Sequence, residues 1–480
     1  MTLKKLALAF AAVSLATFAA VAAEPVKVKT VAELRTAVNS ATTAGTSWDD
    51  PLVIEVADGE YDFEEVGLTT ETQQFLVPKK PWMKIVSASR DPKKCVFIGT
   101  AGSAEHDTST RAITVGSSGN AWIEGITFTN FTRGSIAVNG GAGAIYVNGC
   151  TVGQTVVTNC VIDFCTASQG GGKTVACNAS SEFLITDCRF LNCPNGSVVA
   201  SFNKSPLTVR NCTFVNCASL FGHSKSEMAS LTVSGCTAYD CTGAITTLGS
   251  FTDCVFSNVL NATTSRFIDG FCSFARCTFV RCKDGATPPY ASESFAGALN
   301  ATAGKSSFVN CSVVDCETGK IFFRYSYLTN CLVSASGCNK TWGESHFFDT
   351  CDVVNCTVVE CGSKKSFNVS TTFLNDIFVG CDGLYSATAG HVIYDTLAPG
   401  QTLPGDNKQM TTADIMKMFV GEGPDPYQLC SGRAYAVDQG AEVSWWPGAT
   451  DRRGGTRVIG SAVDIGCYEY RPKGLTLIIR

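Results

Sequence analysis

One short phrase recurs ten times between Val157 and Cys381, and it constrains the fold of this chain more than any other feature. In each copy, an apolar residue stands three positions before an anchor residue and a second apolar residue stands two positions after it. Successive anchors are 18 to 34 residues apart, with a mean of 24. A repeat of this length indicates supersecondary units stacked into a solenoid. The anchors are Cys160, Cys188, Cys212, Cys236, Cys254, Cys277, Cys311, Cys331, Cys356 and Asp376.

The residue before each anchor indicates how one unit turns. Side chains on the same face of a strand are an even number of residues apart, whereas the anchor lies an odd number from the preceding apolar position, so the backbone must bend between them. Asn or Asp precedes most anchors, and both residues tolerate the left-handed conformation that a sharp corner needs. We therefore expect a short strand, a corner, a second short strand and a looser loop in each unit. The predicted corner residues are Asn159, Asp187, Asn211, Asp253, Asn310, Asn330, Asn355 and Asn375.

Stacking these units places like residues above like, with columns of Cys, Phe and Val inside. The Asn-Cys-Thr-Phe type of unit, clearest in residues 207–217, resembles the coils of right-handed parallel β-helix proteins of the pectate-lyase-like superfamily. The resemblance implies an all-β solenoid with a cap at each end. A leucine-rich repeat has a similar period, but it needs a Leu-x-x-Leu-x-Leu frame that is missing here.

The segments that flank the repeats are expected to close the ends of the solenoid. Thr30 and Glu33 form a capping-box pattern, and Val31, Leu34 and Val38 recur at helical spacing, which predicts an N-terminal cap helix. Residues 52–56, 58–61, 84–88 and 96–99 are predicted as the first strands, and residues 123–131 as an early coil with Gly125 at the anchor.

The C-terminal segment begins with a predicted short helix at 412–419 and contains the phrase Asp-Ile-Gly-Cys-Tyr-Glu at 464–469. It resembles the closing segment of secreted bacterial β-helix proteins of the choice-of-anchor type, in which Ala stands at the position of Cys467. This resemblance implies architecture and export rather than a reaction.

The predicted organisation is a signal peptide at 1–23, an N-terminal cap with the initial coils at 24–122, β-helix coils at 123–400 and a C-terminal capping segment at 401–480. The signal peptide rests on Lys4 and Lys5, an apolar stretch at 6–20 and a small-residue cleavage site. We therefore expect a secreted or cell-surface protein without a membrane span after cleavage, and a monomer. A net charge of −5 with 16% charged residues disfavours nucleic acid as a partner.

The 25 cysteines fall mostly in two columns five residues apart, such as Cys212 and Cys217. Val259 and Ser336 replace Cys in the second column, as Asp376 does in the first, which favours buried packing positions and mostly reduced thiols. Some disulfides between the columns remain the alternative. Because Cys-x-x-Cys pairs and dense acidic groups are lacking, neither zinc nor calcium is predicted, and no cofactor is expected.

The sequence lacks the motif sets of known β-helix enzymes. The Asn-Thr-Asp, Gly-His-Gly and Arg-Ile-Lys phrases of polygalacturonases and the Arg-x-Pro-x-x-Arg segment of pectate lyases are missing. Asp49 and Asp50 precede Pro51 outside the coils and are interpreted as a turn. Residues 167–174 loosely match a phosphate-binding loop, but the residues that follow are predicted to be extended rather than helical.

Four polar residues on the strand that opens each coil are the candidate binding residues: His223, Arg266, Arg324 and His346. On one outward face they would line a site for an anionic sugar; the alternative is that they are ordinary solvated positions. Trp342, Trp445 and Trp446 are candidate sugar-stacking residues, with cap packing as the alternative for the last two.

The leading functional hypothesis is a secreted, non-catalytic β-helix protein in adhesion, cell-surface structure or binding of a polysaccharide or cell-surface glycan. The alternative is a polysaccharide lyase or glycoside hydrolase acting on an acidic polysaccharide. A third hypothesis, an autotransporter passenger, is disfavoured because nothing like a membrane barrel follows the coils.

Overall fold

The computed structural model describes residues 24–472 except 67–73, 79, 100–110, 117–118, 134–141, 151–152, 168–172, 195, 202–205, 224–230, 244, 247, 262–265, 270, 285–293, 298–304, 339–344, 364–365, 386–387, 404 and 444–448. The predicted signal peptide and the three tryptophans Trp342, Trp445 and Trp446 therefore lie outside the described residues. No helix in the described part of the chain is both long enough and apolar enough to span a membrane.

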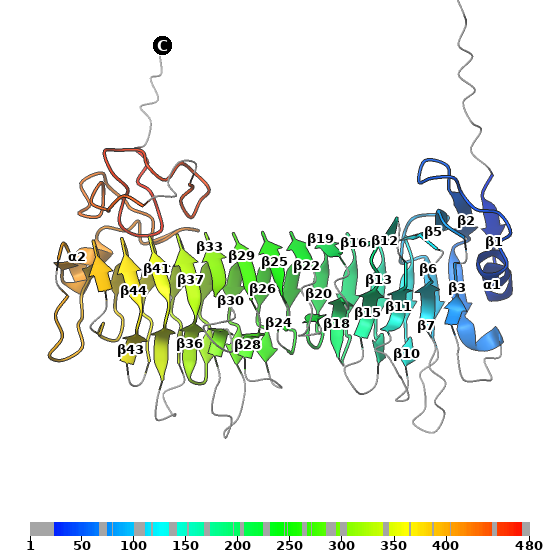
Figure 1. The fold of residues 1–480 in the computed structure, drawn as a ribbon, viewed down its shortest axis with the longest axis horizontal. Coiled ribbons are helices and arrows are strands. Elements are labelled where there is room, and N and C mark those ends of the chain that lie inside the picture. Colours follow the sequence, from blue (N-terminus) through cyan, green and yellow to red (C-terminus); the bar gives the residue numbers. More distant parts are fainter. Residues whose placement is uncertain are drawn as a thin grey trace, which may run out of the picture.

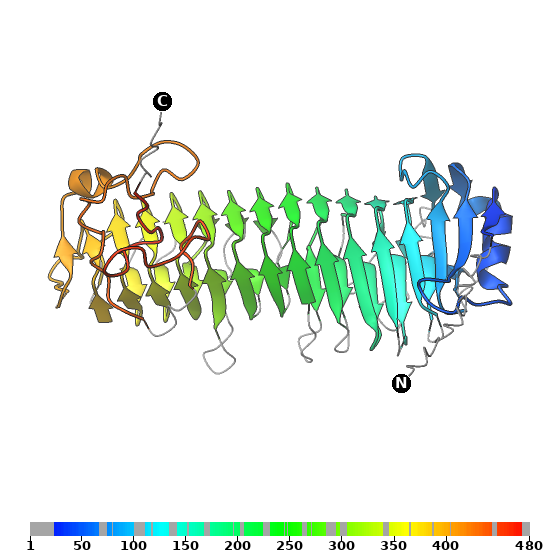
Figure 2. The ribbon, with the colours of Figure 1, turned by 90° about the horizontal axis from the view of Figure 1, so that it is seen from above.

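The chain forms a right-handed parallel β-helix, as predicted, and its strands lie across a long rod (Figures 1 and 2). Each turn of the chain passes through three long sheets in order, which we call sheets A, B and C. Sheets A and B have 15 strands each and sheet C has 12, and neighbouring strands pair in parallel. The segment predicted as a looser loop therefore contains a third strand, in sheet C.

Sheet A consists of β1 (Val26–Val28), β2 (Leu52–Val56), β5 (Met83–Ser87), β8 (Ala121–Glu124), β12 (Gln154–Thr158), β16 (Glu182–Thr186), β19 (Leu207–Arg210), β22 (Leu231–Ser234), β25 (Gly249–Thr252), β29 (Cys272–Ala275), β33 (Ser306–Val309), β37 (Ser326–Thr329), β41 (Asp352–Val354), β44 (Thr372–Leu374) and β46 (Thr388–Gly390). Sheet B consists of β3 (Gly59–Asp62), β6 (Cys95–Ile98), β9 (Thr127–Thr129), β13 (Val161–Asp163), β17 (Arg189–Leu191), β20 (Thr213–Val215), β23 (Thr237–Tyr239), β26 (Val255–Ser257), β30 (Thr278–Val280), β34 (Ser312–Val314), β38 (Leu332–Ser334), β42 (Thr357–Val359), β45 (Ile377–Val379), β47 (Ile393–Tyr394) and β48 (Lys408–Gln409).

Sheet C consists of β4 (Gln74–Leu76), β7 (Arg111–Val115), β11 (Ala142–Asn148), β15 (Lys173–Asn178), β18 (Ser197–Ser201), β21 (Phe221–His223), β24 (Ile245–Thr246), β28 (Arg266–Asp269), β32 (Ser294–Gly297), β36 (Ile321–Arg324), β40 (His346–Asp349) and β43 (Ser366–Val369). Two short sheets join β10 (Thr132–Arg133) to β14 (Thr166–Ala167), and β27 (Leu260–Asn261) through β31 (Lys283–Asp284) and β35 (Glu317–Thr318) to β39 (Gly337–Cys338).

The predicted corners are confirmed. All eight corner residues have φ between 48° and 59°, which is the left-handed region, and each lies between a strand of sheet A and a strand of sheet B. Gly125 corrects the expectation for the early coil. Because Ile123 pairs with Val157, Gly125 stands at the corner, with φ 72°, and Ile126 occupies the anchor position. Gly fits this corner for the same reason as Asn, since it tolerates positive φ.

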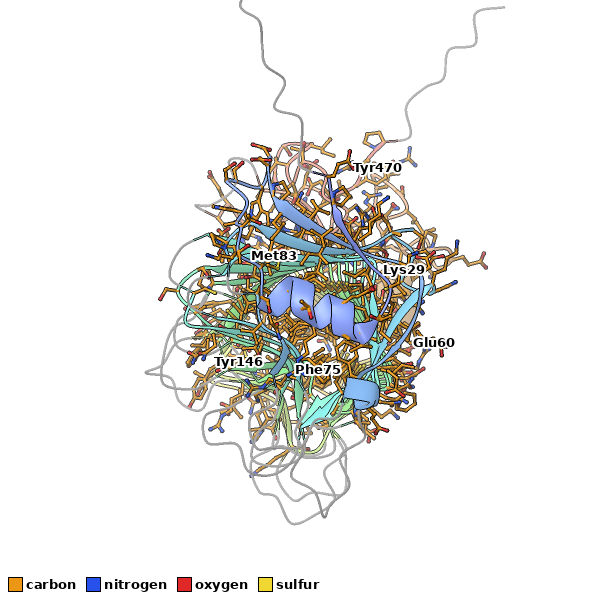
Figure 3. The ribbon with its side chains drawn as sticks, turned by 90° about the vertical axis from the view of Figure 1, so that its right-hand side faces the viewer. Lys29, Glu60, Phe75, Met83, Tyr146 and Tyr470 are labelled. Carbon is orange, nitrogen blue, oxygen red and sulfur yellow. The ribbon has the colours of Figure 1, made fainter. Side chains whose placement is uncertain are left out.

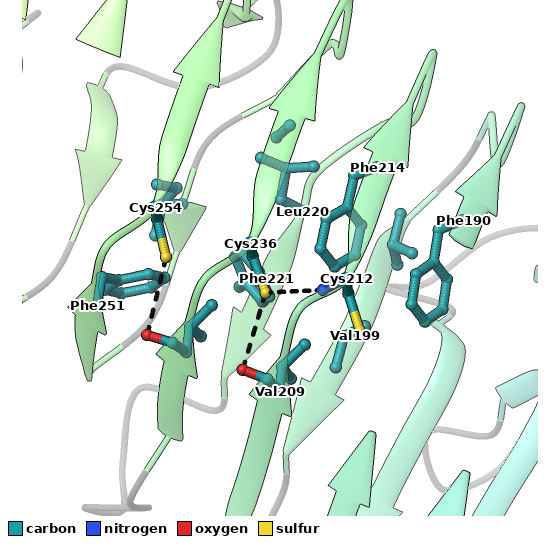
Figure 4. Packing of buried hydrophobic residues seen from close by; sticks show 14 of the residues in the cluster. Phe190, Val199, Val209, Cys212, Phe214, Leu220, Phe221, Cys236, Phe251 and Cys254 are labelled. Carbon is teal, nitrogen blue, oxygen red and sulfur yellow. Dashed lines mark hydrogen bonds between the residues drawn. The ribbon is translucent and has the colours of Figure 1, made fainter. Parts of the chain in front are cut away.

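The interior is a continuous apolar core of Phe, Cys, Val and Ile columns (Figure 4). Like rings stack from coil to coil, with Phe190 and Phe214 4.9 Å apart at an interplanar angle of 7°. All 25 cysteines are free thiols, and all but Cys430 are buried. Their Sγ atoms donate to backbone carbonyls, as Cys236 does to Val209 O at 3.8 Å.

Helix α1 (Val31–Asn39) lies across the N-terminal end of the rod, as predicted (Figure 3). Thr30 is its N-cap and accepts a hydrogen bond from Glu33 N at 3.2 Å, while Val31, Leu34 and Val38 are buried. The short 3-10 helix η1 (Phe63–Val66) follows β3. Helix α1 thereby covers apolar side chains that the first coil would otherwise expose.

The C-terminal segment packs along the side of the last coils (Figures 1 and 2). Helix α2 (Thr412–Met416) is shorter than the predicted 412–419 helix, and its Ile415 is buried. With Ile465, this residue covers an apolar outer face of sheet B formed by Val359, Ile377 and Ile393. The segment therefore buries a face of the rod as well as lying near its end.

Candidate functional site

The four predicted site residues all lie on sheet C. His223 ends β21, Arg266 begins β28, Arg324 ends β36 and His346 begins β40. Strands β24 and β32 separate the first three residues from one another in the sheet. The side chains of His223 and Arg266 lie outside the described part of the structure. The four residues lie on the third strand of the coil rather than on the strand that opens it, and they are spread over several coils.

Arg324 and His346 do not converge on a common point. Arg324 pairs in register with Asp349, and its Nε lies 3.1 Å from Asp349 Oδ2. Its guanidinium also lies 5.2 Å from the centre of the Tyr325 ring. His346 is three residues before Asp349 on the same strand, which corresponds to about 10 Å. The charge of Arg324 is thus balanced within the protein, so this residue is a poorer anion-binding candidate than the sequence suggested.

A second group on the outer face of sheet C, nearer the N-terminal end, was not predicted. We call Arg111, Tyr146, Lys173 and Ser197 the sheet C cluster. In the strands β7, β11, β15 and β18, the paired residues Ile113, Ile145, Val175 and Val199 point into the core, and the residues that follow them point outward.

Arg111 and Tyr146 form one half of this cluster. The Arg111 guanidinium lies 4.6 Å from the centre of the Tyr146 ring, a cation–π contact, and the two residues are only 9% and 4% exposed. Tyr146 OH is 3.5 Å from Asn148 Oδ1 and accepts from Asn178 Nδ2 at 3.5 Å. The ring is therefore held flat against the sheet, with its hydroxyl in a polar network.

Lys173 and Ser197 form the other half. Lys173 Nζ donates to Ser197 Oγ at 3.1 Å, and burial lowers the pKa of Lys173. Gly222 on β21 makes room for this pair, because a Cβ there would lie 2.1 Å from Ser197 Oγ and 3.2 Å from Lys173 Nζ. A glycine at this position is thus required for the close approach of the two side chains.

The two cations of the cluster have no carboxylate partner among the described residues, unlike several other cations of the chain. Arg276, Lys283 and Arg324 each form an ion pair with a carboxylate. Among the described residues, Arg111 contacts an aromatic ring and Lys173 a hydroxyl. Thr114, in register with Tyr146, has a buried hydroxyl without a described hydrogen-bond partner. The cluster therefore presents positive charge and hydrogen-bonding groups that suit an anionic, hydroxyl-rich ligand.

Some of this could be recognised in the sequence and some could not. Lys173 stands in the Gly-Lys-Thr phrase of the loose phosphate-loop match, and β15 begins at Lys173, so the predicted extended conformation is confirmed. Asp50 accepts from Thr46 Oγ1 at 2.8 Å in a bend, as the turn interpretation of this segment predicted. Arg111 and Tyr146 lie before the ten repeats, and nothing in the sequence indicated that they would meet.

The structure also gathers tryptophans other than those singled out in the sequence. Trp48 packs edge-on against Trp82 at 5.1 Å and against Trp122 at 6.0 Å, beside the first strands of sheet A. Lys84 Nζ lies 4.9 Å from the centre of the Trp122 ring. All three rings are partly exposed and pack on one another at the surface. No group of three His, Cys, Asp or Glu suited to a metal ion occurs in the described ranges.

Comparison with known proteins agrees with the fold. Residues 106–261 match a family model described as "Right handed beta helix region", which covers the first half of the repeats. No curated protein matches the chain in sequence.

Among solved structures, the PL6 family polysaccharide lyase Pedsa3628 from Pseudopedobacter saltans is 12% identical, with a TM-score of 0.41 over 92% of this chain and 99% of that one. The alginate lyase AlyF-OU02 is 8% identical, with a TM-score of 0.43 over 78% of this chain and 86% of that one. The catalytic domain of a GH87 α-1,3-glucanase is 9% identical, with a TM-score of 0.38 over 81% and 68%. With TM-scores below 0.5, these likenesses carry no argument about the ligand of this chain.

Proposed function

We propose that this protein binds an acidic polysaccharide along the outer face of sheet C. The observation that carries the proposal is the presence of two cations, the buried Arg111 and the partly buried Lys173, without a carboxylate partner among the described residues. A buried charge is costly unless it is paired, and an anionic ligand supplies the missing partner. Together with the predicted signal peptide, this supports a role as a secreted or cell-surface glycan-binding protein.

The geometry favours a polymer over a small anion. Arg111 and Lys173 stand two residues before Ile113 and Val175, which both pair with Ile145 of β11. The two cations are therefore about 10 Å apart along the rod. Tyr146 lies on the strand between them, and its buried ring supports the Arg111 guanidinium. A linear chain of uronate or sulfated sugars lying along the rod would place successive anionic groups near successive cations.

A second candidate function, cleavage of the same polymer by β-elimination, is favoured by the lowered pKa of Lys173. In this reaction a base removes the proton next to a uronate carboxylate, and the bond to the glycosidic oxygen breaks to leave an unsaturated sugar. A lysine whose pKa is lowered by burial is a better base near neutral pH than an exposed one. Arg111, about 10 Å away along the rod, would then hold the carboxylate of a neighbouring sugar.

The test is a panel of alginate, polygalacturonate, chondroitin sulfate, heparin and neutral glucans, read for both binding and formation of unsaturated uronates. We expect at least one acidic polymer to bind and Lys173→Met to weaken that binding about tenfold or more, the loss of a charged hydrogen bond. Lys417→Met is the matched control, because the Lys417 side chain, at the C-cap of α2, is 75% exposed.

Unsaturated products that disappear in Lys173→Met would establish the lyase function. Binding without products would support the non-catalytic function. If no acidic polymer binds, or if Lys173→Met and Lys417→Met behave alike, the proposal is wrong.

A further inference from the structure

A pocket of about 570 Å³ lies at the other end of the rod, between the last coil and the C-terminal segment. Its size falls within the range of pockets that bind small molecules. The functional groups lining it are His391, Asp406, Lys408, Tyr435, Asp438 and Gln439. None of these residues belongs to sheet C, so the pocket is separate from the sheet C cluster.

His391 is held in one orientation at the wall of this pocket. It stands at the corner after β46 with φ 54°, the position that Asn375 occupies one coil earlier. His391 Nδ1 lies 2.9 Å from Gln439 O. Because a carbonyl oxygen only accepts, Nδ1 carries the proton, and Nε2 of the neutral ring is left as an acceptor. This Nε2 lies 3.9 Å from Asp406 Oδ2, a carboxylate that is largely exposed.

The opposite wall comes from the C-terminal segment and is also held in place. Asp438 donates its backbone N–H to Asp464 Oδ1 at 2.8 Å and accepts from Ala462 N at 3.0 Å. The Tyr435 ring is 41% exposed, and Lys408 Nζ lies 5.6 Å from its centre. The pocket thus combines an exposed aromatic ring with donors and acceptors held by the backbone.

The charges around the pocket select the class of ligand. Lys408 faces two carboxylates, Asp406 and Asp438, so these three side chains sum to a charge of −1 and the pocket disfavours an anion. Hydroxyl groups donate and accept at once, and they match a lining that alternates acceptors (His391 Nε2, Asp406) with donors (Lys408). We propose that this pocket binds a neutral sugar unit, with one face of the sugar on Tyr435 and its hydroxyls on His391 and Asp406.

The proposal does not depend on the acidic-polymer site of sheet C. It would make the protein a two-site glycan binder, with an acidic chain on sheet C and a neutral sugar at the C-terminal end.

The test measures binding of cellohexaose, maltohexaose and chitohexaose to the full chain by calorimetry and by NMR line broadening of the ligand. Two variants probe the pocket. Tyr435→Ala removes the exposed ring, and His391→Asn removes the imidazole while keeping a residue that other coils use at this corner. Tyr385→Ala is the matched control, because Tyr385 is 39% exposed and lies outside the pocket lining.

We expect one of the three neutral oligosaccharides to bind, and each pocket variant to weaken binding about tenfold or more, with Tyr385→Ala unchanged. Thermal melting points equal to that of the parent would show that the variants fold. The proposal is overturned if the parent binds none of the three sugars, or if both folded pocket variants bind as well as Tyr385→Ala. If Lys173→Met weakens binding of the acidic polymer, the result for the neutral oligosaccharides is not affected. The two sites are therefore tested separately.

Discussion

The anchor residue of each coil contributes hydrogen bonds as well as packing. The anchor residue follows a left-handed corner. In several coils its backbone N–H donates a hydrogen bond to the anchor side chain of the next coil. Cys212 N donates to Cys236 Sγ at 3.4 Å, and Cys356 N donates to Asp376 Oδ1 at 2.6 Å. A small side chain with an acceptor therefore suits this column, which explains why Cys is preferred there.

Asp376 offers a test of this role. Its other oxygen accepts from Leu374 N at 2.9 Å, and burial raises the pKa of its carboxyl well above the ordinary value. Asp376→Ala leaves the Cys356 N–H without an acceptor, whereas Asp376→Cys restores the thiol that the other coils use. We expect the Cys variant to be more stable than the Ala variant by about 1–3 kcal/mol in urea unfolding. Equal midpoints for the two variants would mean that the column is only a packing position.

Phe214 tests the inward register. Its ring is fully buried and stacks on Phe190, whereas the neighbouring Thr213 is partly exposed on sheet B. Phe214→Ala should lower the free energy of unfolding by about 3–5 kcal/mol, and Thr213→Ala should change it by less than about 1 kcal/mol. Similar small shifts in thermal melts would contradict the register.

At the scale of the element, the corner between sheets A and B sets the shape of each coil. Asn211 has φ 51°, and its Nδ2 donates to Asp187 Oδ1 at 3.3 Å, one coil earlier. Gly235 stands at the same corner in the next coil, so a glycine is compatible with this turn.

The cost of the left-handed corner can be measured at Asn211. Asn211→Ala should destabilise the protein by about 1–2 kcal/mol, because positive φ brings the Cβ atom of an ordinary residue too close to the backbone. Asn211→Gly should come closer to the parent, because glycine adopts this conformation without strain. Circular dichroism melts of the three proteins check this order, and an Ala variant as stable as the Gly variant would count against it.

At the scale of the whole molecule, a buried ionic cluster joins the C-terminal segment to the coils. Arg457 is fully buried, donates to Asp464 O at 2.7 Å and Gly466 O at 2.6 Å, and lies 4.0 Å from Glu469. Gly466 N donates to Asn375 O at 2.8 Å, which ties this segment to the last corners. The stability of the whole rod end thus depends on how these groups ionise.

This cluster predicts a pH dependence of stability. Burial, with the neighbouring Asp464, raises the pKa of Glu469 from 4.5 to about 7, while Arg457 opposes the rise. Between these values the folded protein holds a proton that the unfolded chain has lost, so the free energy of unfolding should fall by on the order of 3 kcal/mol as the pH rises from about 4.5 to 7. Burial also raises the pKa of Asp464, which acts in the same direction.

Unfolding midpoints measured across this pH range check the prediction. Glu469→Gln should flatten the dependence, whereas Glu422→Gln, an exposed carboxyl on the same segment, should leave it as it is. A Glu469→Gln protein with the slope of the parent would show that other groups are responsible.

Much of the fold was predictable because its rules are local and repeat. The corner residues, the apolar positions on either side of the anchor and the capping box at Thr30 each follow from the conformation of a few neighbouring residues. The anchor of the early coil was predicted one residue too early, at Gly125, because that coil has no Cys at its anchor position.

The candidate sites could not be predicted in the same way. Lys173 meets Ser197 and Arg111 meets Tyr146 only through the register of sheet C, and the anchors are 18 to 34 residues apart, so sequence spacing does not say which residues of sheet C are neighbours. The four residues chosen from the sequence lie on one sheet but do not come together. The sequence does not show which residues lie beside an outward-facing strand position. Asp349 beside Arg324 is one example.

The sequence by itself determined the coil, since a left-handed Asn corner between two short apolar strands is a local preference repeated often enough to specify a solenoid. The tertiary structure alone decided what lies on its surface. Where the C-terminal segment docks, which cations lack a carboxylate and where a pocket forms at His391 depend on contacts between residues far apart in the chain, and such contacts are set by packing rather than by local conformation.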